Sequence, residues 1–188
     1  MAGIRSAWIY KGSGEAGFLR AGEVHITDRG NANVTKLGKR YTNLPAGWDD
    51  PDFGFGTYNS GEIGFIKSEK VWVTDWDVPR LISSHFPTPP EDWKHGGINS
   101  AWIYPSGEAG FLMKGEVHIT DRGKGNRTLL KDRYKNLPTG WELPDFGFGT
   151  YKSGEIGFIK GDQVWVTDWD EPRLISSHFP TLPDDWKN

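Results

Sequence analysis

Apolar residues in this chain form short segments, and glycine or proline interrupts the sequence about every ten residues. In the first quarter of the chain the segments are 6–10, 16–20, 23–27 and 39–42. None of them is long enough for the amphipathic helices of a helical solenoid. Four short segments bounded by turns predict four short strands.

The chain is an internal repeat at two levels. Residues 14–94 match residues 107–187 at 62 of 81 positions, with a constant offset of 93. Each half divides again, because the pattern Gly-Glu-x-Gly-Phe at 14–18 recurs 47 residues later at 61–65. The chain therefore contains four units in the order A-B-A′-B′. The near-identity of the halves indicates either duplication or a symmetrised design.

A unit of four short strands is typical of one propeller blade. A single blade exposes apolar faces that its neighbours must cover, and four blades closed in a ring leave no bare end. The sequence therefore predicts an all-β fold, a four-bladed β-propeller with internal two-fold duplication. We expect a single domain over 1–188, with blades at approximately 1–48, 49–95, 96–141 and 142–188.

Composition narrows the functional classes. The net charge is −3 and no run of Lys or Arg occurs, which argues against a nucleic-acid partner. The chain has no cysteine, so disulfides and thiolate metal sites are excluded. No apolar window is long enough for a membrane span or a signal peptide. We expect a cytoplasmic protein, or one released without a classical signal peptide.

Several motifs resemble those of hemopexin-type repeats. Residues 157–165, GFIKGDQVW, are similar to that family's aromatic-rich hairpin, and residues 172–183, PRLISSHFPTLP, resemble its outer segment. Residues 98–102, INSAW, resemble the segment that opens each blade. The resemblance covers the whole chain and implies a four-bladed propeller. The family includes haem carriers, protease-docking domains and plant seed albumins, so the resemblance does not fix a function.

The resemblance also implies a site on the propeller axis. The blade openings carry Asp52 and Asp145 in two units, whereas Arg5 and Asn99 stand in the other two where the family prefers Asp. On this basis we expect Asp52, Asp145 and Asn99 near the axis, as ligands of a cation such as calcium or of a polyamine. No cofactor is expected to be required.

The sequence contains no recognisable catalytic set. It lacks a Gly-x-Ser-x-Gly elbow and a phosphate-binding loop. His85 and His178 follow serines in what we interpret as the outer edge of a blade. His25 and His118 occupy strand positions where Trp72 and Trp165 stand in the other units, which favours a space-filling role. We therefore predict a protein that is not an enzyme.

The best candidates for ligand contact are two tryptophans. Trp76 and Trp169 follow Thr-Asp, where the A units place Arg29 and Arg122. A core position rarely alternates between Trp and Arg, so these positions are expected at a rim. A rim aromatic can stack on a sugar ring. With neighbouring residues the predicted ligand-binding set is Trp76, Trp169, Arg29, Arg122, Tyr58, Tyr151, Asp77 and Asp170.

These features favour a multivalent carbohydrate-binding lectin, with glycans as partners. One alternative is a hemopexin-like carrier of haem or a polyamine. Haem could be ligated by His25 with His118 or by His85 with His178. Another alternative is a protein-docking module, and the chain could also form a homodimer.

Overall fold

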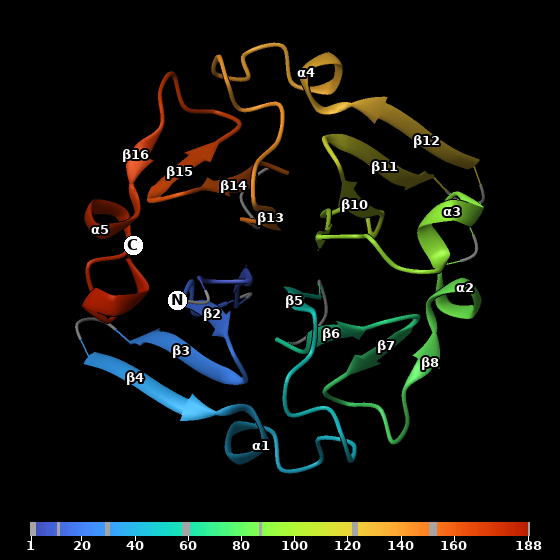
Figure 1. The fold of residues 1–188 in the computed structure, drawn as a ribbon, viewed down its shortest axis with the longest axis vertical. Helices are drawn as coiled ribbons and strands as arrows, with labels where there is room; N and C mark the ends of the chain where they lie inside the picture. The colour runs from blue at the N-terminus through green and yellow to red at the C-terminus, as the bar shows by residue number, and fades with distance from the viewer. Residues whose placement is uncertain are drawn as a thin grey trace.

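The fold is a ring of four antiparallel, four-stranded sheets (Figure 1). The computed structural model describes residues 3–10, 12–28, 31–57, 61–86, 88–121, 124–150 and 154–187. Within each sheet the strands follow chain order, so each blade is a simple meander. This arrangement confirms the predicted all-β, four-bladed propeller. The sheets span 6–36, 53–81, 100–129 and 146–174, and the exact domain bounds remain a prediction.

The strands of the four blades are short, as expected. Blade 1 contains β1 (Ser6–Ile9), β2 (Ala16–Arg20), β3 (Glu23–Asp28) and β4 (Asn31–Lys36). Blade 2 contains β5 (Phe53–Gly56), β6 (Ile63–Lys67), β7 (Lys70–Val73) and β8 (Arg80–Leu81). Blade 3 contains β9 (Ser100–Ile103), β10 (Ala109–Met113), β11 (Glu116–Asp121) and β12 (Lys124–Leu129). Blade 4 contains β13 (Phe146–Gly149), β14 (Ile156–Lys160), β15 (Gln163–Val166) and β16 (Arg173–Leu174).

Short helices follow the outer strands and complete each blade. They are α1 (Leu37–Arg40), α2 (Ile82–His85), α3 (Glu91–Lys94), α4 (Leu130–Arg133), α5 (Ile175–His178) and the 3-10 helix η1 (Asp184–Trp186). The helices α1, α2, α4 and α5 each bury their first residue, Leu or Ile. Each of these helices thus fixes the end of its outer strand against the blade.

The prediction of a strand at 39–42 is wrong. The fourth strand of blade 1 is β4, and residues 37–40 form α1. β4 pairs with β3 along its full length although its sequence, NANVTK, is mostly polar. An outermost strand can be polar because it is fixed by backbone hydrogen bonds to its neighbour and needs no apolar face of its own. The positions of the apolar residues alone were therefore not sufficient to locate β4.

The inner strands β1, β5, β9 and β13 lie beside one another around the axis. Two buried hydroxyls connect neighbouring inner strands. Ser6 Oγ accepts a hydrogen bond of 2.8 Å from the Gly54 backbone N–H, and Ser100 Oγ accepts one of 2.8 Å from Gly147. Both serines are fully buried, so these bonds fix the register between blades 1 and 2 and between blades 3 and 4.

The hydrophobic core consists of four clusters, each shared by two adjacent blades. Trp48, Trp93, Trp141 and Trp186, which end the four sequence units, are all buried in these clusters. These four tryptophans therefore pack between blades. Trp72 and Trp165 are also fully buried. Each stacks on a phenylalanine of the adjacent strand, which removes it from solvent.

A glycine on the second strand of every blade allows an aromatic ring of the first strand to lie flat against it. A Cβ atom added to Gly17 or Gly110 would fall within 3.0 Å of the indole of Trp8 or Trp102. A Cβ atom on Gly64 or Gly157 would meet the ring of the facing phenylalanine in the same way. The recurring Gly-Glu-x-Gly-Phe pattern therefore keeps its second glycine because no larger residue fits.

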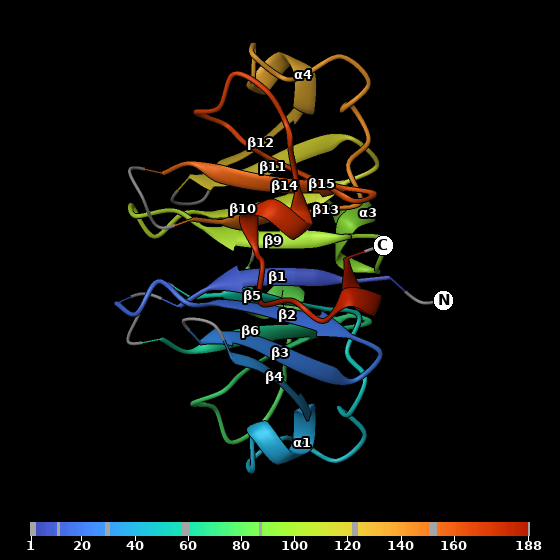
Figure 2. The same ribbon diagram turned by 90° about the vertical axis from the view of Figure 1, so that its left-hand side faces the viewer.

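The ring closes by non-covalent contacts between the C-terminal segment and blade 1. Trp186 packs in the cluster that contains Ala7 and Phe18. Arg20 Nη1 donates to the carboxylate of Asp185 at 2.8 Å. Asp92, which occupies the position equivalent to Asp185, is paired with Arg127 instead, beside the buried Trp93. The two termini lie at one side of the ring, as Figure 2 shows.

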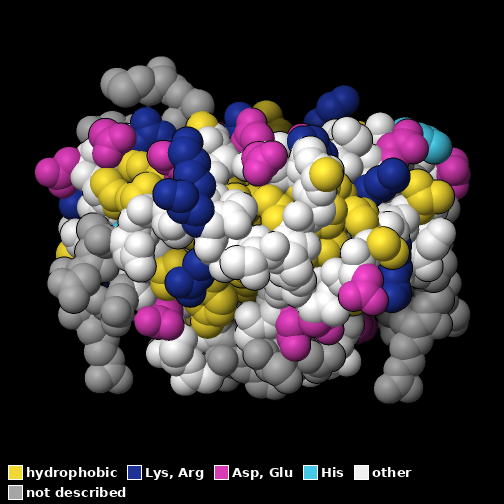
Figure 3. Space-filling view, turned by 90° about the horizontal axis from the view of Figure 1, so that it is seen from below, with side chains coloured by type: hydrophobic (Ala, Val, Ile, Leu, Met, Phe, Trp, Pro, Cys, Tyr) yellow, Lys and Arg dark blue, Asp and Glu magenta, His cyan; other side chains and the backbone are white. Residues whose placement is uncertain are grey.

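Apolar side chains on the surface are interspersed with charges. The outer face near α1 shows Lys, Arg, Asp and Glu between small apolar areas (Figure 3). The large apolar side chains exposed in the described part of the chain are Val34, Val78, Leu81, Leu129, Leu143 and Leu174. No helix among the described residues is long and apolar enough to cross a membrane.

The contact between glycine and the aromatic ring can be tested by adding one methyl group. Gly64→Ala and Gly157→Ala should each lower the free energy of unfolding by roughly 1–3 kcal/mol, because the ring must move within a packed core. Urea unfolding measures the change. Gly3→Ala is the control, since no atom lies within 4 Å of its added Cβ. Unchanged stability in both core variants would contradict this account of the repeat.

Candidate functional site

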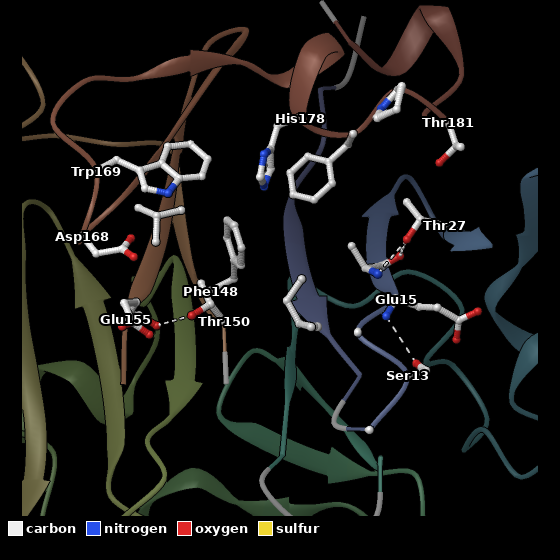
Figure 4. Close-up of a pocket in the computed structure, with 17 residues that line it drawn as sticks. Ser13, Glu15, Thr27, Phe148, Thr150, Glu155, Asp168, Trp169, His178 and Thr181 are labelled. Atoms are coloured by element: carbon white, nitrogen blue, oxygen red, sulfur yellow. Dashed lines mark hydrogen bonds between the residues drawn. The ribbon is translucent and has the colours of Figure 1, made fainter. Parts of the chain in front are cut away.

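The main cleft lies at the seam where blade 4 meets blade 1. Its volume is about 880 Å³. The walls come from the β13–β14 and β1–β2 turns, the β15–β16 loop and the segment after α5, and Figure 4 shows how they face one another. The cleft is therefore built from the first and the last blade, which are brought together only when the ring closes.

A row of aromatic rings forms one side of the cleft. The ring centroids of Trp169 and His178 are 4.8 Å apart, edge to face, and those of His178 and Phe179 are 4.6 Å apart. Phe179 continues the row to Phe18 of blade 1, at 4.9 Å. The row joins the rim of the cleft to the buried core of the seam, so its outer members are held in fixed orientations.

Trp169 is fixed by contacts on several sides. Its backbone N–H donates to the Val166 carbonyl at 2.8 Å, and its carbonyl accepts from Trp165 Nε1 at 3.0 Å. The guanidinium of Arg173 lies 4.0 Å from the ring centroid and covers one face of the indole. Trp169 remains partly exposed. It is thus a rigid aromatic group at a rim, as its alternation with arginine predicted.

The polar lining divides into satisfied and unsatisfied groups. Thr27 Oγ1 accepts from the Ala16 N–H at 2.7 Å, and Thr150 Oγ1 donates to the Glu155 carbonyl at 3.0 Å. By contrast, Glu155 Oε2 and Thr181 Oγ1 are withdrawn from solvent and have no hydrogen-bond partner among the described residues. An unpaired buried polar atom costs free energy, so both are natural contact points for a ligand.

The seam between blades 2 and 3 repeats the same arrangement. Trp76 and His85 are 4.6 Å apart, His85 and Phe86 4.5 Å, and Phe86 and Phe111 5.0 Å. Arg80 covers one face of Trp76 at 4.1 Å. Thr88 Oγ1 is buried and unpartnered, as its counterpart Thr181 is. The two seams therefore carry equivalent sets of side chains.

The predicted ligand residues divide into three groups. Trp169 lines the cleft, and Trp76 holds the equivalent place at the other seam. Asp77 and Asp170 are exposed next to these tryptophans but are not among the residues that line the cleft. Four residues lie outside the described part of the chain: Arg29, Arg122, Tyr58 and Tyr151.

Sequence reasoning missed the cleft residues Glu155, Asp168, His178 and Thr181. A usable signal was present, because the Glu of Gly-Glu-x-Gly-Phe recurs in every unit and precedes a strand. The histidine of SSHFP was interpreted as an edge residue, whereas in both B units it packs on the rim tryptophan.

The residues expected near the axis cap turns within their own blades. Asp52 Oδ2 accepts from the Ser68 N–H at 2.6 Å, and Asp145 Oδ2 accepts from the Gly161 N–H at 2.7 Å. Asn99 is exposed. No group of three His, Cys, Asp or Glu side chains suited to a metal ion occurs among the described residues. An axial cation or polyamine remains a prediction.

The histidines do not form the pairs that bis-His haem ligation requires. His25 and His118 belong to blades 1 and 3, and His85 and His178 to blades 2 and 4, which face each other across the ring (Figure 1). His25 is fully buried next to Phe18 and Trp186. His118 is packed in the same way by Phe111 and Trp93. These two residues fill space in the core, as the sequence predicted.

Comparison with known proteins shows a shared fold. No family model and no curated protein sequence matches the chain. The structure is similar to LS24, a seed albumin from Lathyrus sativus, with a TM-score of 0.80, 16% identity and 98% of each chain covered. It is also similar to the hemopexin fold protein CP4 from cow pea, with a TM-score of 0.77, 16% identity and coverage of 96% of this chain and 97% of that one.

A third similar structure is a plant lectin with two metal binding sites from Cicer arietinum. The TM-score is 0.76 at 16% identity, over 94% of this chain and 95% of the lectin. At these identities the likeness shows the fold alone. It confirms the hemopexin-type propeller that the sequence motifs predicted.

Because His25 and His118 are buried, we expect the free energy of unfolding to decrease at acidic pH. Burial lowers the pKa of His25 and His118 below the ordinary value of 6.5, and Arg127 lowers that of His118 further. The unfolded chain therefore takes up these protons first, so the free energy of unfolding should fall as the pH drops below about 6.5.

Urea unfolding at about pH 7.5 and about pH 5.5 measures this slope. The double variant His25→Phe/His118→Phe should show a smaller loss between the two pH values than the parent protein. His85 also has a lowered pKa, so part of the slope should persist. An unchanged slope in the double variant would show that the buried imidazoles do not cause it.

Proposed function

We propose that the chain is a non-enzymatic, carbohydrate-binding protein with two equivalent sites, one at the Trp169 seam and one at the Trp76 seam. The observation that carries this proposal is the cleft of about 880 Å³, in which a rigid, partly exposed indole lies beside polar atoms that lack partners. Concave sites with an aromatic wall and a few fixed polar groups are typical binding sites for small ligands.

The indole provides a stacking surface. Because Arg173 covers one face of Trp169, a ligand ring would contact the other face. A sugar ring has an apolar face of C–H groups that packs on an aromatic ring and an edge of hydroxyls that needs hydrogen-bond partners. Glu155 Oε2 can accept from such a hydroxyl, and Thr181 Oγ1 can both donate and accept.

Two sites on one rim suit multivalent binding. Trp76 and Trp169 both lie on the loop between the third and fourth strands of a blade. These loops leave blades 2 and 4 at the same side of the ring, so both sites would face one surface. Two weak sites on a rigid body bind a densely glycosylated surface much more tightly than either site alone.

The fold likeness to a plant lectin supports a binding role without fixing the ligand. A small-molecule carrier is the second candidate. The carboxylates of Glu155 and Asp168 in one cleft favour it, because they suit a polyamine. No histidine pair in the described structure supports the carriage of haem.

The proposal predicts that each tryptophan controls one site. A glycan array should reveal binding to a related group of sugars, and calorimetry with the best of them should give two sites per chain. Trp169→Ala and Trp76→Ala should each remove one site and leave the other unchanged. The double variant should lose at least about tenfold in affinity, because the stacking surface is absent from both seams.

Val78→Ala is the matched control, since it truncates an exposed apolar side chain two residues beyond Trp76. Its binding should equal that of the parent. A double tryptophan variant that is folded and binds sugar as the parent does would refute the assignment. An array without signal would remove the lectin proposal and leave the carrier.

A further inference from the structure

The ionisable side chains that line the Trp169 cleft indicate which charge a ligand would carry. Its ionisable lining residues in the described part of the chain are Glu15, Glu155, Asp168 and His178. Figure 4 shows Asp168 and Glu155 on the wall below Trp169, with Glu15 on the opposite wall. Three of the four are carboxylates, and the Arg173 guanidinium on one face of Trp169 adds a positive charge at the rim, so negative charges outnumber positive ones around the indole.

One oxygen of the Glu155 carboxylate has no donor among the described residues. Its backbone carbonyl accepts from both the N–H and the hydroxyl of Thr150, which fixes the residue at the β13–β14 turn. The side-chain atom Oε2 is withdrawn from solvent and has no partner among the described residues. A carboxylate oxygen in that position is costly unless a donor arrives with the ligand.

A protonated amine fits this requirement better than a hydroxyl does. An ammonium group has three donors and no acceptor, and its hydrogen bonds to carboxylates are charge-assisted. It is also attracted to aromatic rings, and the partly exposed indole of Trp169 lies in the same cleft. A neutral hydroxyl would leave the charges of Asp168 and Glu155 uncompensated.

The matching seam carries the same residue types, although Glu62 Oε2 accepts a long hydrogen bond of 3.4 Å from Thr57 Oγ1. Glu62, Asp75 and Trp76 stand where Glu155, Asp168 and Trp169 stand in blade 4. Partial burial and the charge of Arg80 lower the pKa of His85, so its imidazole is neutral at neutral pH. His85 therefore adds no positive charge to the Trp76 seam at neutral pH.

We propose that the saccharide bound at these seams carries a free, protonated amine, as a glucosamine unit without its acetyl group does. The proposal rests on the carbohydrate-binding function proposed above and adds the ligand's charge. Carboxylates below the tryptophan hold the ammonium while the indole holds the apolar face of the sugar ring.

The test compares three oligosaccharides of equal length that differ at one substituent. The full chain carrying Trp76→Ala, which leaves only the Trp169 seam, is titrated with tetramers of β-1,4-linked glucosamine, N-acetylglucosamine and glucose. The glucosamine tetramer should bind at least about tenfold more tightly than the other two. Its advantage should disappear when the pH is raised until the amine is neutral, and it should shrink with added salt.

Substitutions that remove one carboxylate charge test which residues hold the amine of the glucosamine tetramer. In the same background, Glu155→Gln and Asp168→Asn should each lower affinity for the glucosamine tetramer by about tenfold and leave the glucose tetramer almost unchanged. Asp162→Asn is the matched control, because it removes one exposed charge at the β14–β15 turn on the opposite rim. It should have no effect on either tetramer.

The outcomes separate this inference from the proposed function. Equal binding of all three tetramers would overturn the charged-ligand inference and leave the lectin proposal intact. Spermidine that binds while no tetramer does would overturn both and favour the polyamine carrier. Binding of neutral sugar that requires added calcium would also overturn the inference, because the carboxylates would then be serving a metal ion.

Discussion

The structure depends on a contact between an aromatic ring of the first strand and a glycine of the second strand in every blade. A Cβ atom added at this glycine would collide with the ring, which belongs to Trp8, Phe55, Trp102 or Phe148. These rings fill the space between adjacent blades, where four clusters hold almost all of the buried apolar side chains of the described residues. A ring of four small sheets has little other apolar area to bury, so the strand packing, the closure of the ring and the position of the seams all follow from this contact.

The two kinds of seam differ because the A and B units differ at a few positions. After the third strand, a B unit continues with Asp-Trp-Asp and ends in SSHFP, which places a tryptophan and a histidine against each other at the rim. These side chains line the seam that follows each B unit, between blades 4 and 1 and between blades 2 and 3. The duplication thus creates two equivalent sites on one rim, half a turn of the ring apart. The other two seams carry tyrosine pairs such as Tyr10 with Tyr41.

The fold could be predicted from the sequence, and the site only in part. The repeat period, the frequent turns and the paired Gly-Glu-x-Gly-Phe motifs were sufficient for a four-bladed propeller, because each is a local consequence of blade geometry. The rim position of Trp169 followed from its replacement by arginine in the A units. Glu155 had a signal in the sequence, because its motif recurs in every unit, but its place in a cleft could not be predicted, since the opposite wall comes from blade 1 and reaches it only when the ring closes. The strand β4 was missed for the related reason that its position is fixed by pairing with β3 and not by apolar residues of its own.

The central claim is that the two B-unit seams, and not the axis of the ring, are the binding sites. A crystal structure of the chain soaked with a glucosamine oligomer tests it most directly. The account predicts one sugar ring against Trp169 and one against Trp76, each with its amine near the adjoining carboxylates. Density for the ligand on the axis, beside Asp52 and Asp145, with both tryptophan seams empty, would contradict it.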